Sequence, residues 1–196
     1  MEACRLIATD LACRRGGRLL FKGLGLALEA GQALHVAGPN GTGKSSLIRI
    51  LSGLARPYAG MVERHGAVGL IDERPALDEH QPLGRALDFW ANIDTNIDAN
   101  AAPPPAALGL APLLEVPVRY LSTGQRKRAA HARQIGQRAP IWLLDEPLNG
   151  LDRDAAHLCE QLVANHCADG GIAVIASHQP FALAGMATLP LADFTA

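Results

Sequence analysis

The fold of this chain is decided by one stretch, GPNGTGKSS, residues 38–46. The stretch fits the pattern G-x-x-x-x-G-K-[ST] at every fixed position. It lies between an apolar run, ALHVA, and a helical pattern, SSLIRILSGL. Glycines allow backbone conformations in which successive N–H groups point into one concavity, and the helix that follows adds its positive end there. The stretch therefore predicts a phosphate-binding loop between a strand and a helix.

Each residue type in this loop has an expected role. Lys44 should reach the β- and γ-phosphates of a nucleotide, and the Ser45 hydroxyl should bind Mg²⁺. The residues expected to bind the phosphates are Gly38, Pro39, Asn40, Gly41, Thr42, Gly43, Lys44, Ser45 and Ser46.

Strand and helix patterns alternate along the chain. Strands are expected at residues 5–8, 24–28, 33–37, 67–71, 141–144 and 172–176, and helices at 44–54, 83–90, 123–138 and 153–166. This alternation predicts an α/β fold with a mainly parallel central sheet, the class of P-loop NTPases.

The segment at about 75–136 differs from the rest, because it lacks strand signals. Its proline run, Pro103–Pro105, is expected to be a connector, since proline fits neither a helix interior nor a central strand. We expect one domain over residues 1–196, in which 1–74 and 137–196 form the catalytic lobe and about 75–136 an inserted helical subdomain.

A second motif, IWLLDEP, occupies residues 141–147. Its apolar residues predict a buried strand that ends beside the phosphate loop. Asp145 could then hold Mg²⁺ and its water shell, and Glu146 could polarise an attacking water as a general base. The two motifs alone leave kinases, GTPases, helicases and transport ATPases open. GTPases are disfavoured, because no Asn-Lys-x-Asp guanine-binding motif is present.

Composition excludes several classes of protein. The formal net charge is −1, which disfavours a nucleic-acid-binding protein. The spacing of Cys4, Cys13, Cys159 and Cys167 fits neither a zinc site nor a redox pair, so we expect reduced thiols. The first residues do not fit a signal peptide, and no apolar run approaches the ~20 residues of a membrane span. Any membrane association should therefore come through a partner.

Three further segments resemble motifs of the ATP-binding cassette (ABC) ATPases. LSTGQ, residues 121–125, resembles their signature, LNGLD at 148–152 their D-loop, and IASHQ at 175–179 their switch-histidine segment. The resemblance implies a two-lobed, ATP-hydrolysing subunit that pairs head to tail. ATP would lie between the phosphate loop of one subunit and the signature of the other.

The resemblance also implies roles for single residues. His178 would contact the γ-phosphate or the attacking water, and Asn149 and Asp152 would cross the interface between subunits. The signature residues that act on the partner's ATP would be Ser122, Thr123, Gly124 and Gln125. Thr123 stands where the signature usually has glycine. The cations after Gln125 can pair with acids of the central lobe, but the expected role of Lys127 and Arg128 individually is a solvated helix face.

Two positions depart from the ABC pattern. Arg15, or its neighbour Arg14, stands where an aromatic residue usually stacks on adenine, and a guanidinium can also stack on a base. Arg74 replaces the glutamine that contacts Mg²⁺ and senses the membrane partner, and Glu73 is adjacent. Residues 52–69 are short for the family, which suggests a trimmed β-subdomain.

Within the superfamily, the chain resembles the ATP-binding subunits of haem-exporter complexes of cytochrome c maturation. The resemblance rests on the small size and on CRRGGRLLF, DERPALDEHQPLGRALDFW, LSTGQRKRAAHAR and SHQP. It implies integral membrane partners at the cytoplasmic face of a bacterial inner membrane. It also implies that ATP hydrolysis drives release of haem-loaded chaperone. The alternatives are an ATPase of another exporter, with a different membrane partner, and a soluble cassette protein.

Overall fold

A five-stranded sheet forms the centre of the molecule. The structure, a computed structural model, describes residues 4–72, 76–93 and 108–195. The sheet order is β5 (Val68–Ile71), β6 (Ile141–Asp145), β7 (Ile172–Ser177), β3 (Ala33–Ala37) and β8 (Ala187–Pro190). Every neighbouring pair in this sheet is parallel. The predicted α/β class with a parallel central sheet is thus confirmed, although the short strand β8 was not predicted.

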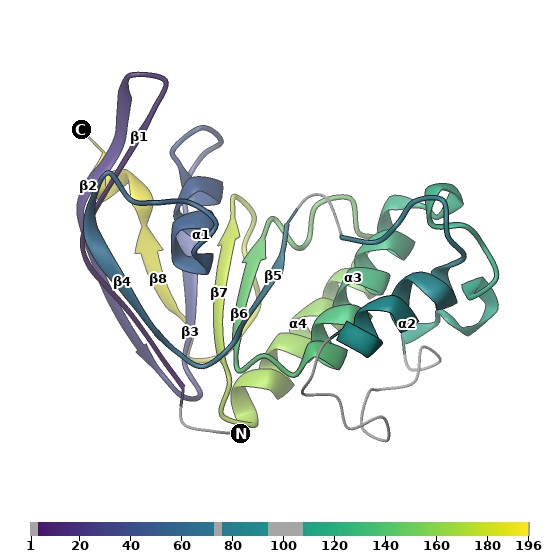
Figure 1. Ribbon diagram of the computed structural model, residues 1–196. Helices are drawn as coiled ribbons and strands as arrows, with labels where there is room; N and C mark the ends of the chain where they lie inside the picture. The colour runs from purple at the N-terminus through teal and green to yellow at the C-terminus, as the bar shows by residue number, and fades with distance from the viewer. Residues whose placement is uncertain (1–3, 73–75, 94–107, 196) are drawn as a thin grey trace.

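A second sheet of three antiparallel strands covers one side of the molecule (Figure 1). Its order is β2 (Arg18–Glu29), β1 (Arg5–Arg15) and β4 (Ala59–His65). The sequence predicted only the apolar parts of β1 and β2 and missed β4, whose side chains are mostly exposed. The stretch between α1 and β5 thus contains one strand, β4.

Helices lie on both sides of the parallel sheet. Figure 1 shows α1 (Lys44–Ser52) between the two sheets, and the other helices beyond the parallel sheet. These are α2 (Leu83–Ile93), α3 (Thr123–Gln137) and α4 (Arg153–Ala168), with short 3₁₀ helices at η2 (Ala111–Leu113) and η3 (Val118–Tyr120). A further 3₁₀ helix, η4 (Leu191–Phe194), packs against β2. Helix α1 ends two residues earlier than predicted, because Gly53 adopts a left-handed conformation (φ 87°). Arg74, Glu73 and Pro103–Pro105 lie outside the described residues.

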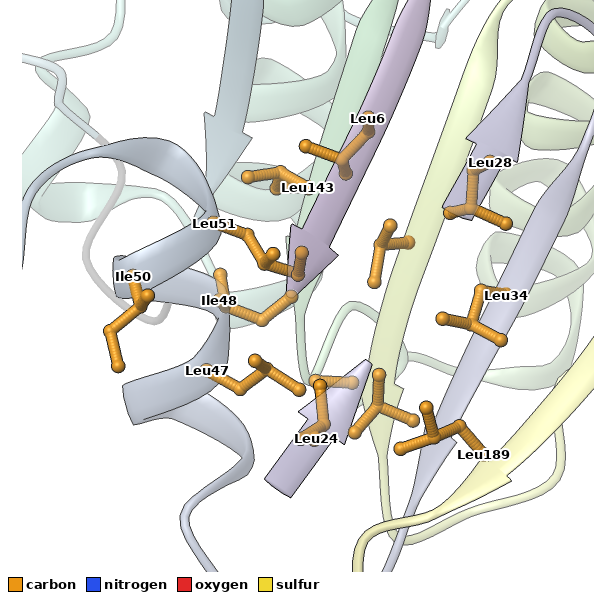
Figure 2. Close-up of a cluster of buried hydrophobic side chains, with 14 of the residues drawn as sticks. Leu6, Leu24, Leu28, Leu34, Leu47, Ile48, Ile50, Leu51, Leu143 and Leu189 are labelled. Carbon is orange, nitrogen blue, oxygen red and sulfur yellow. The ribbon is translucent and has the colours of Figure 1, made fainter. Parts of the chain in front are cut away.

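The main core fills the space between the two sheets. Figure 2 shows apolar side chains of α1 meeting those of β1, β2, β3, β6 and β8. Strand β6 alternates: Ile141 and Leu143 point into this core, whereas Trp142 and Leu144 point to the other face, toward α4. A strand buried on both faces is typical of parallel sheets. This packing fixes the end of β6, where the acidic residues lie.

A third apolar cluster lies away from both sheets. Its buried members are Leu77, Leu83, Ala86, Leu108, Leu110, Val118, Leu121 and Ala129. Leu158 and Leu162 of α4 pack against it, so α4 contributes to two cores. All four cysteines are free and buried. Among the described residues, no helix combines the length and the hydropathy needed to span a bilayer.

Candidate nucleotide site

The phosphate loop connects β3 to α1, and the backbone at its junction with α1 requires glycine. Gly43 is the N-cap of α1 with φ 106°, and no side chain caps that helix end. A Cβ on Gly43 would lie 3.3 Å from Leu20 and Phe21, so the loop packs directly on β2. The unpaired N–H groups at the start of α1 are thus left for an anion.

Lys44 is buried under this loop. Its ammonium donates to the carbonyl oxygens of Gly38 (2.8 Å) and Pro39 (3.2 Å) and lies 3.3 Å from Oε1 of Glu146. Only 5% of Lys44 is exposed. A buried cation requires such partners, because desolvation is costly. Lys44, the residue expected to bind phosphate, is therefore held at the loop by two carbonyls and a carboxylate of its own chain.

Glu146 stands at the junction of two adjacent strand ends. It follows β6, its N–H donates to Ala176 of β7 (2.8 Å), and its φ of 48° is in the left-handed region. Its Oε2 lies 2.9 Å from Nδ1 of His178, which comes directly after β7. The carboxyl ends of parallel strands are where α/β sheets place ligands. The structure thus brings together Lys44, Glu146 and His178, whose catalytic roles stay predictions.

A cavity of about 340 Å³ opens above these residues. Its lining consists of Leu20, Asn40, Gly41, Gly43, Lys44, Ser45, Ser46, Glu146 and Asn149. The sequence did not predict Leu20 as a residue of this site. The only indication was its position in the apolar run LLF, shortly before the loop. Asn149, assigned by resemblance to the subunit interface, also lines the cavity of its own chain. Arg15 is exposed at the end of β1 and is not part of this lining, so its stacking on adenine stays a prediction.

Asp145 is the last residue of β6 and is buried beside Glu146. Ser45 is exposed in the lining of the cavity. A carboxylate and a hydroxyl, completed by phosphate oxygens and waters, are the donors that Mg²⁺ prefers. Among the described residues, no group of three or more His, Cys, Asp and Glu side chains could hold a metal by itself.

The signature corner lies outside this cavity and forms the N-cap of α3. The Ser122 Oγ accepts from the Gln125 N–H (3.3 Å), and the Gln125 Oε1 accepts from the Ser122 N–H (2.8 Å). Such a reciprocal capping box orders the corner within its own chain. Gly124 lies in the first turn of α3, where a Cβ would be 3.9 Å from Leu151. Neither Ser122 nor Thr123 is buried.

The corner contacts the loop after β6. A Cβ on Gly150 would lie 3.0 Å from Cγ2 of Thr123, so the threonine that replaces glycine packs on a glycine opposite. Asp152, expected at the subunit interface, caps α4 by accepting from the Ala155 N–H (2.8 Å). Thr123 and Asp152 thus both have structural roles within their own chain.

The expectation of a solvated face at Lys127 is wrong. Its ammonium donates to the main-chain carbonyl of Glu146 at 2.6 Å, and both Lys127 and Arg128 are half-buried. The preceding Arg126 donates to the carbonyls of Leu121 (3.1 Å) and Arg119 (2.7 Å). The alternative role was pairing with acids of the central lobe, and the contact does reach Glu146, an acid of that lobe, but through its main-chain carbonyl. The basic run itself was the signal.

Comparisons with known proteins agree with this geometry. Residues 21–149, more than half of the chain, match the ABC transporter family. The chain is 58% identical, over 99% of both chains, to the cytochrome c biogenesis ATP-binding export protein CcmA of Novosphingobium aromaticivorans. It is 55% identical to the protein of the same name from Sphingopyxis alaskensis, over 91% of this chain and 92% of that one.

A solved structure of the ATP-binding subunit of an ABC transporter superimposes with a TM-score of 0.80. It covers 88% of this chain and 79% of its own, and at 23% identity it supports the fold alone. The family match and the high identity over nearly the whole chain together establish the relationship. The chain belongs to the ABC transporter family of ATPases, among its cytochrome c biogenesis ATP-binding export proteins.

Proposed function

We propose that this chain is the ATP-hydrolysing subunit of a cytochrome c biogenesis complex, acting on integral membrane partners at the cytoplasmic face of a bacterial inner membrane. One observation carries the proposal. The buried Glu146 carboxylate contacts Lys44 of the phosphate loop on one side and His178 on the other. This is an arrangement for hydrolysis at a phosphate, and the names of the relatives supply the biological process.

In the proposed site, Lys44 exchanges partners when nucleotide enters. Its ammonium now contacts two loop carbonyls and Glu146, and phosphate oxygens would take their place. The N–H groups of the loop and of the start of α1 hold the β- and γ-phosphates. Ser45 and Asp145 would hold Mg²⁺, which neutralises charge on the phosphates when it is bound. Arg15 is the proposed partner of the adenine.

Glu146 is the proposed general base. Once Lys44 turns to phosphate, the carboxylate is free to accept a proton from a water aligned with the γ-phosphate. Two groups of His178 contact Oε2 of Glu146: the ring Nδ1, and the backbone N–H at 3.5 Å. Together they fix the orientation of that oxygen. The His178 side chain is 37% exposed, and its ring is proposed to reach the water or the phosphate.

The second half of the site is proposed to come from another subunit. Ser122, Thr123, Gly124 and Gln125 lie at the positive end of α3, yet they line no part of the cavity in their own chain. A head-to-tail pair would bring this corner to the partner's phosphates. Residues 1–74 and 137–196 would move as one lobe and about 75–136 as another. Hydrolysis in this pair would drive release of haem-loaded chaperone by the membrane partners.

A complementation experiment tests the proposed process. A host strain that lacks this gene should lose covalently haem-bound c-type cytochromes, measured by haem staining of membrane proteins. The wild-type gene should restore them, and a Lys44→Ala variant should not. A matched Lys22→Ala variant, exposed on β2, should restore them fully. Normal cytochromes in the deletion strain, or with Lys44→Ala, would refute the proposal.

A further inference from the structure

Lysine is rare in this chain, and its placement is selective. Only Lys22, Lys44 and Lys127 occur among the 18 basic residues. Lys22 is exposed on β2, whereas the other two both contact Glu146. Lys44 contacts its carboxylate at 3.3 Å, and Lys127 its main-chain carbonyl at 2.6 Å. Two ammonium groups from different motifs thus hold Glu146, one at its carboxylate and one at its main-chain carbonyl.

The carbonyl that Lys127 contacts belongs to an unusual backbone. Glu146 has φ 48°, a conformation that non-glycine residues seldom adopt and that needs support from the surroundings. The carbonyl also accepts from the Asn149 N–H (3.3 Å), and the Glu146 N–H donates to Ala176. The Lys127 contact is the shortest of these and the only charge-assisted one, and such bonds are the stronger kind.

Lys127 is half-buried and contacts the turn after β6. Burial lowers the pKa of His131 to about 4, and the charge of Lys127 adds to that effect. On α4, burial raises the pKa of the Cys159 thiol to about 12, and the same charge opposes the rise. Because the contact with Glu146 is partly buried, solvent screens it less than it would a surface contact.

We propose that Lys127 is a positioning residue for ATP hydrolysis, which holds the Glu146 carbonyl so that the carboxylate faces the phosphate loop. Helix α3 begins at the signature corner, and Lys127 lies in its second turn. A shift of α3 when the corner meets a partner's phosphate would therefore change the hold on Glu146. This inference rests on the proposed role of Glu146 as the base.

Variants of the full chain test the inference through kcat and ATP affinity measured separately. Lys127→Met keeps the length and removes the donor, so kcat should fall about tenfold to a hundredfold while the Kd for ATP stays within about twofold. Lys127→Gln retains a neutral donor and should recover most of the lost rate. Lys22→Met is the matched control on the surface and should behave as the wild type.

A cycle with Glu146→Gln separates positioning from simple loss of structure. If Lys127 acts through Glu146, then Lys127→Met should not lower the residual rate of the Glu146→Gln variant further. The inference is overturned if kcat of Lys127→Met is normal, if its loss matches the unfolded fraction in a thermal melt, or if the two losses multiply. Normal hydrolysis by Glu146→Gln alone would instead refute the proposed base.

Discussion

The phosphate loop and the signature corner are both glycine-containing turns at the start of a helix, but they treat their polar groups in opposite ways. The loop at Gly38–Ser46 leaves the end of α1 uncapped, encloses a buried lysine and lines a cavity. The corner at Ser122–Gln125 caps its own helix, is largely exposed and lines no part of that cavity.

The difference fits the proposal that the two turns are halves of different sites. A helix end that is already capped keeps its geometry without a ligand, so under this proposal the corner would be preorganised to receive a phosphate from outside the chain. The loop, in contrast, holds Lys44 through contacts that nucleotide can replace. Substitutions in each turn can test whether the loop holds the ligand and the corner receives it.

The largest effect is expected at Glu146, on the loop side. Glu146→Gln should lower hydrolysis by about 10²–10⁴-fold, because the amide cannot accept the proton. ATP binding should persist, since the loop and Lys44 are intact, and pairs of chains should accumulate with ATP in size-exclusion chromatography. Glu63→Gln, exposed on β4, is the control. Unchanged turnover would mean that the base lies elsewhere.

Ser122→Asp should separate the two roles of the corner. Aspartate caps a helix as well as serine does, so the thermal midpoint should change little. Its charge would repel a phosphate, so hydrolysis should fall by about 10²–10³-fold, while ATP binding to the single chain is unaffected. Ser122→Thr, which keeps cap and hydroxyl, should remain active. A normal rate with Ser122→Asp would show that no phosphate reaches this corner.

The smallest effect on turnover is expected at His131, on the buried face of α3, where the consequence is for stability. Its pKa, lowered from 6.5 to about 4 by burial and then by Lys127, corresponds to about 3 kcal/mol between the two protonation states. As the pH falls, His131 binds a proton near pH 6.5 in the unfolded chain but only near pH 4 in the folded chain. Stability is therefore fully present above pH 6.5 and falls as the pH drops toward 4.

His131→Leu should flatten this part of the stability curve in urea unfolding between pH 4 and 7. The buried His166, whose pKa is also lowered by burial, should keep a residual slope of the same sign. His65→Leu, exposed on β4, serves as the control and should leave the slope as it is. An unchanged slope in His131→Leu would show that this histidine does not contribute.

The sequence predicted the parallel sheet and the loop because both have strong local signals. Strands β6 and β7 are continuous apolar runs, and the loop has glycines at fixed spacing. Strand β4 was missed because its side chains are mostly exposed, and much of β1 and β2 because charged residues interrupt the pattern. Asp10 sits at an irregularity of β1 (φ 49°), where the register shifts and the alternation breaks.

The candidate site was predictable where chemistry follows from a side chain in a motif. Glu146 and His178 come directly after two adjacent strands, and Lys44 begins the helix after the loop that leaves β3, so the three side chains meet. The contact of Lys127 was not predictable, because it depends on how α3 packs against the turn after β6. The capping box could have been read from Ser122 and Gln125, which fit the S-x-x-Q spacing.

The most direct test of the division between the two turns is a mixture of two inactive chains. Ser122→Arg spoils the corner, and Lys44→Ala spoils the loop. In a mixed pair, one site combines the intact loop of the first chain with the intact corner of the second, and both lesions fall in the other site. With random pairing, an equal mixture should recover about a quarter of the wild-type hydrolysis rate per chain. No recovery above the two separate variants would contradict the account.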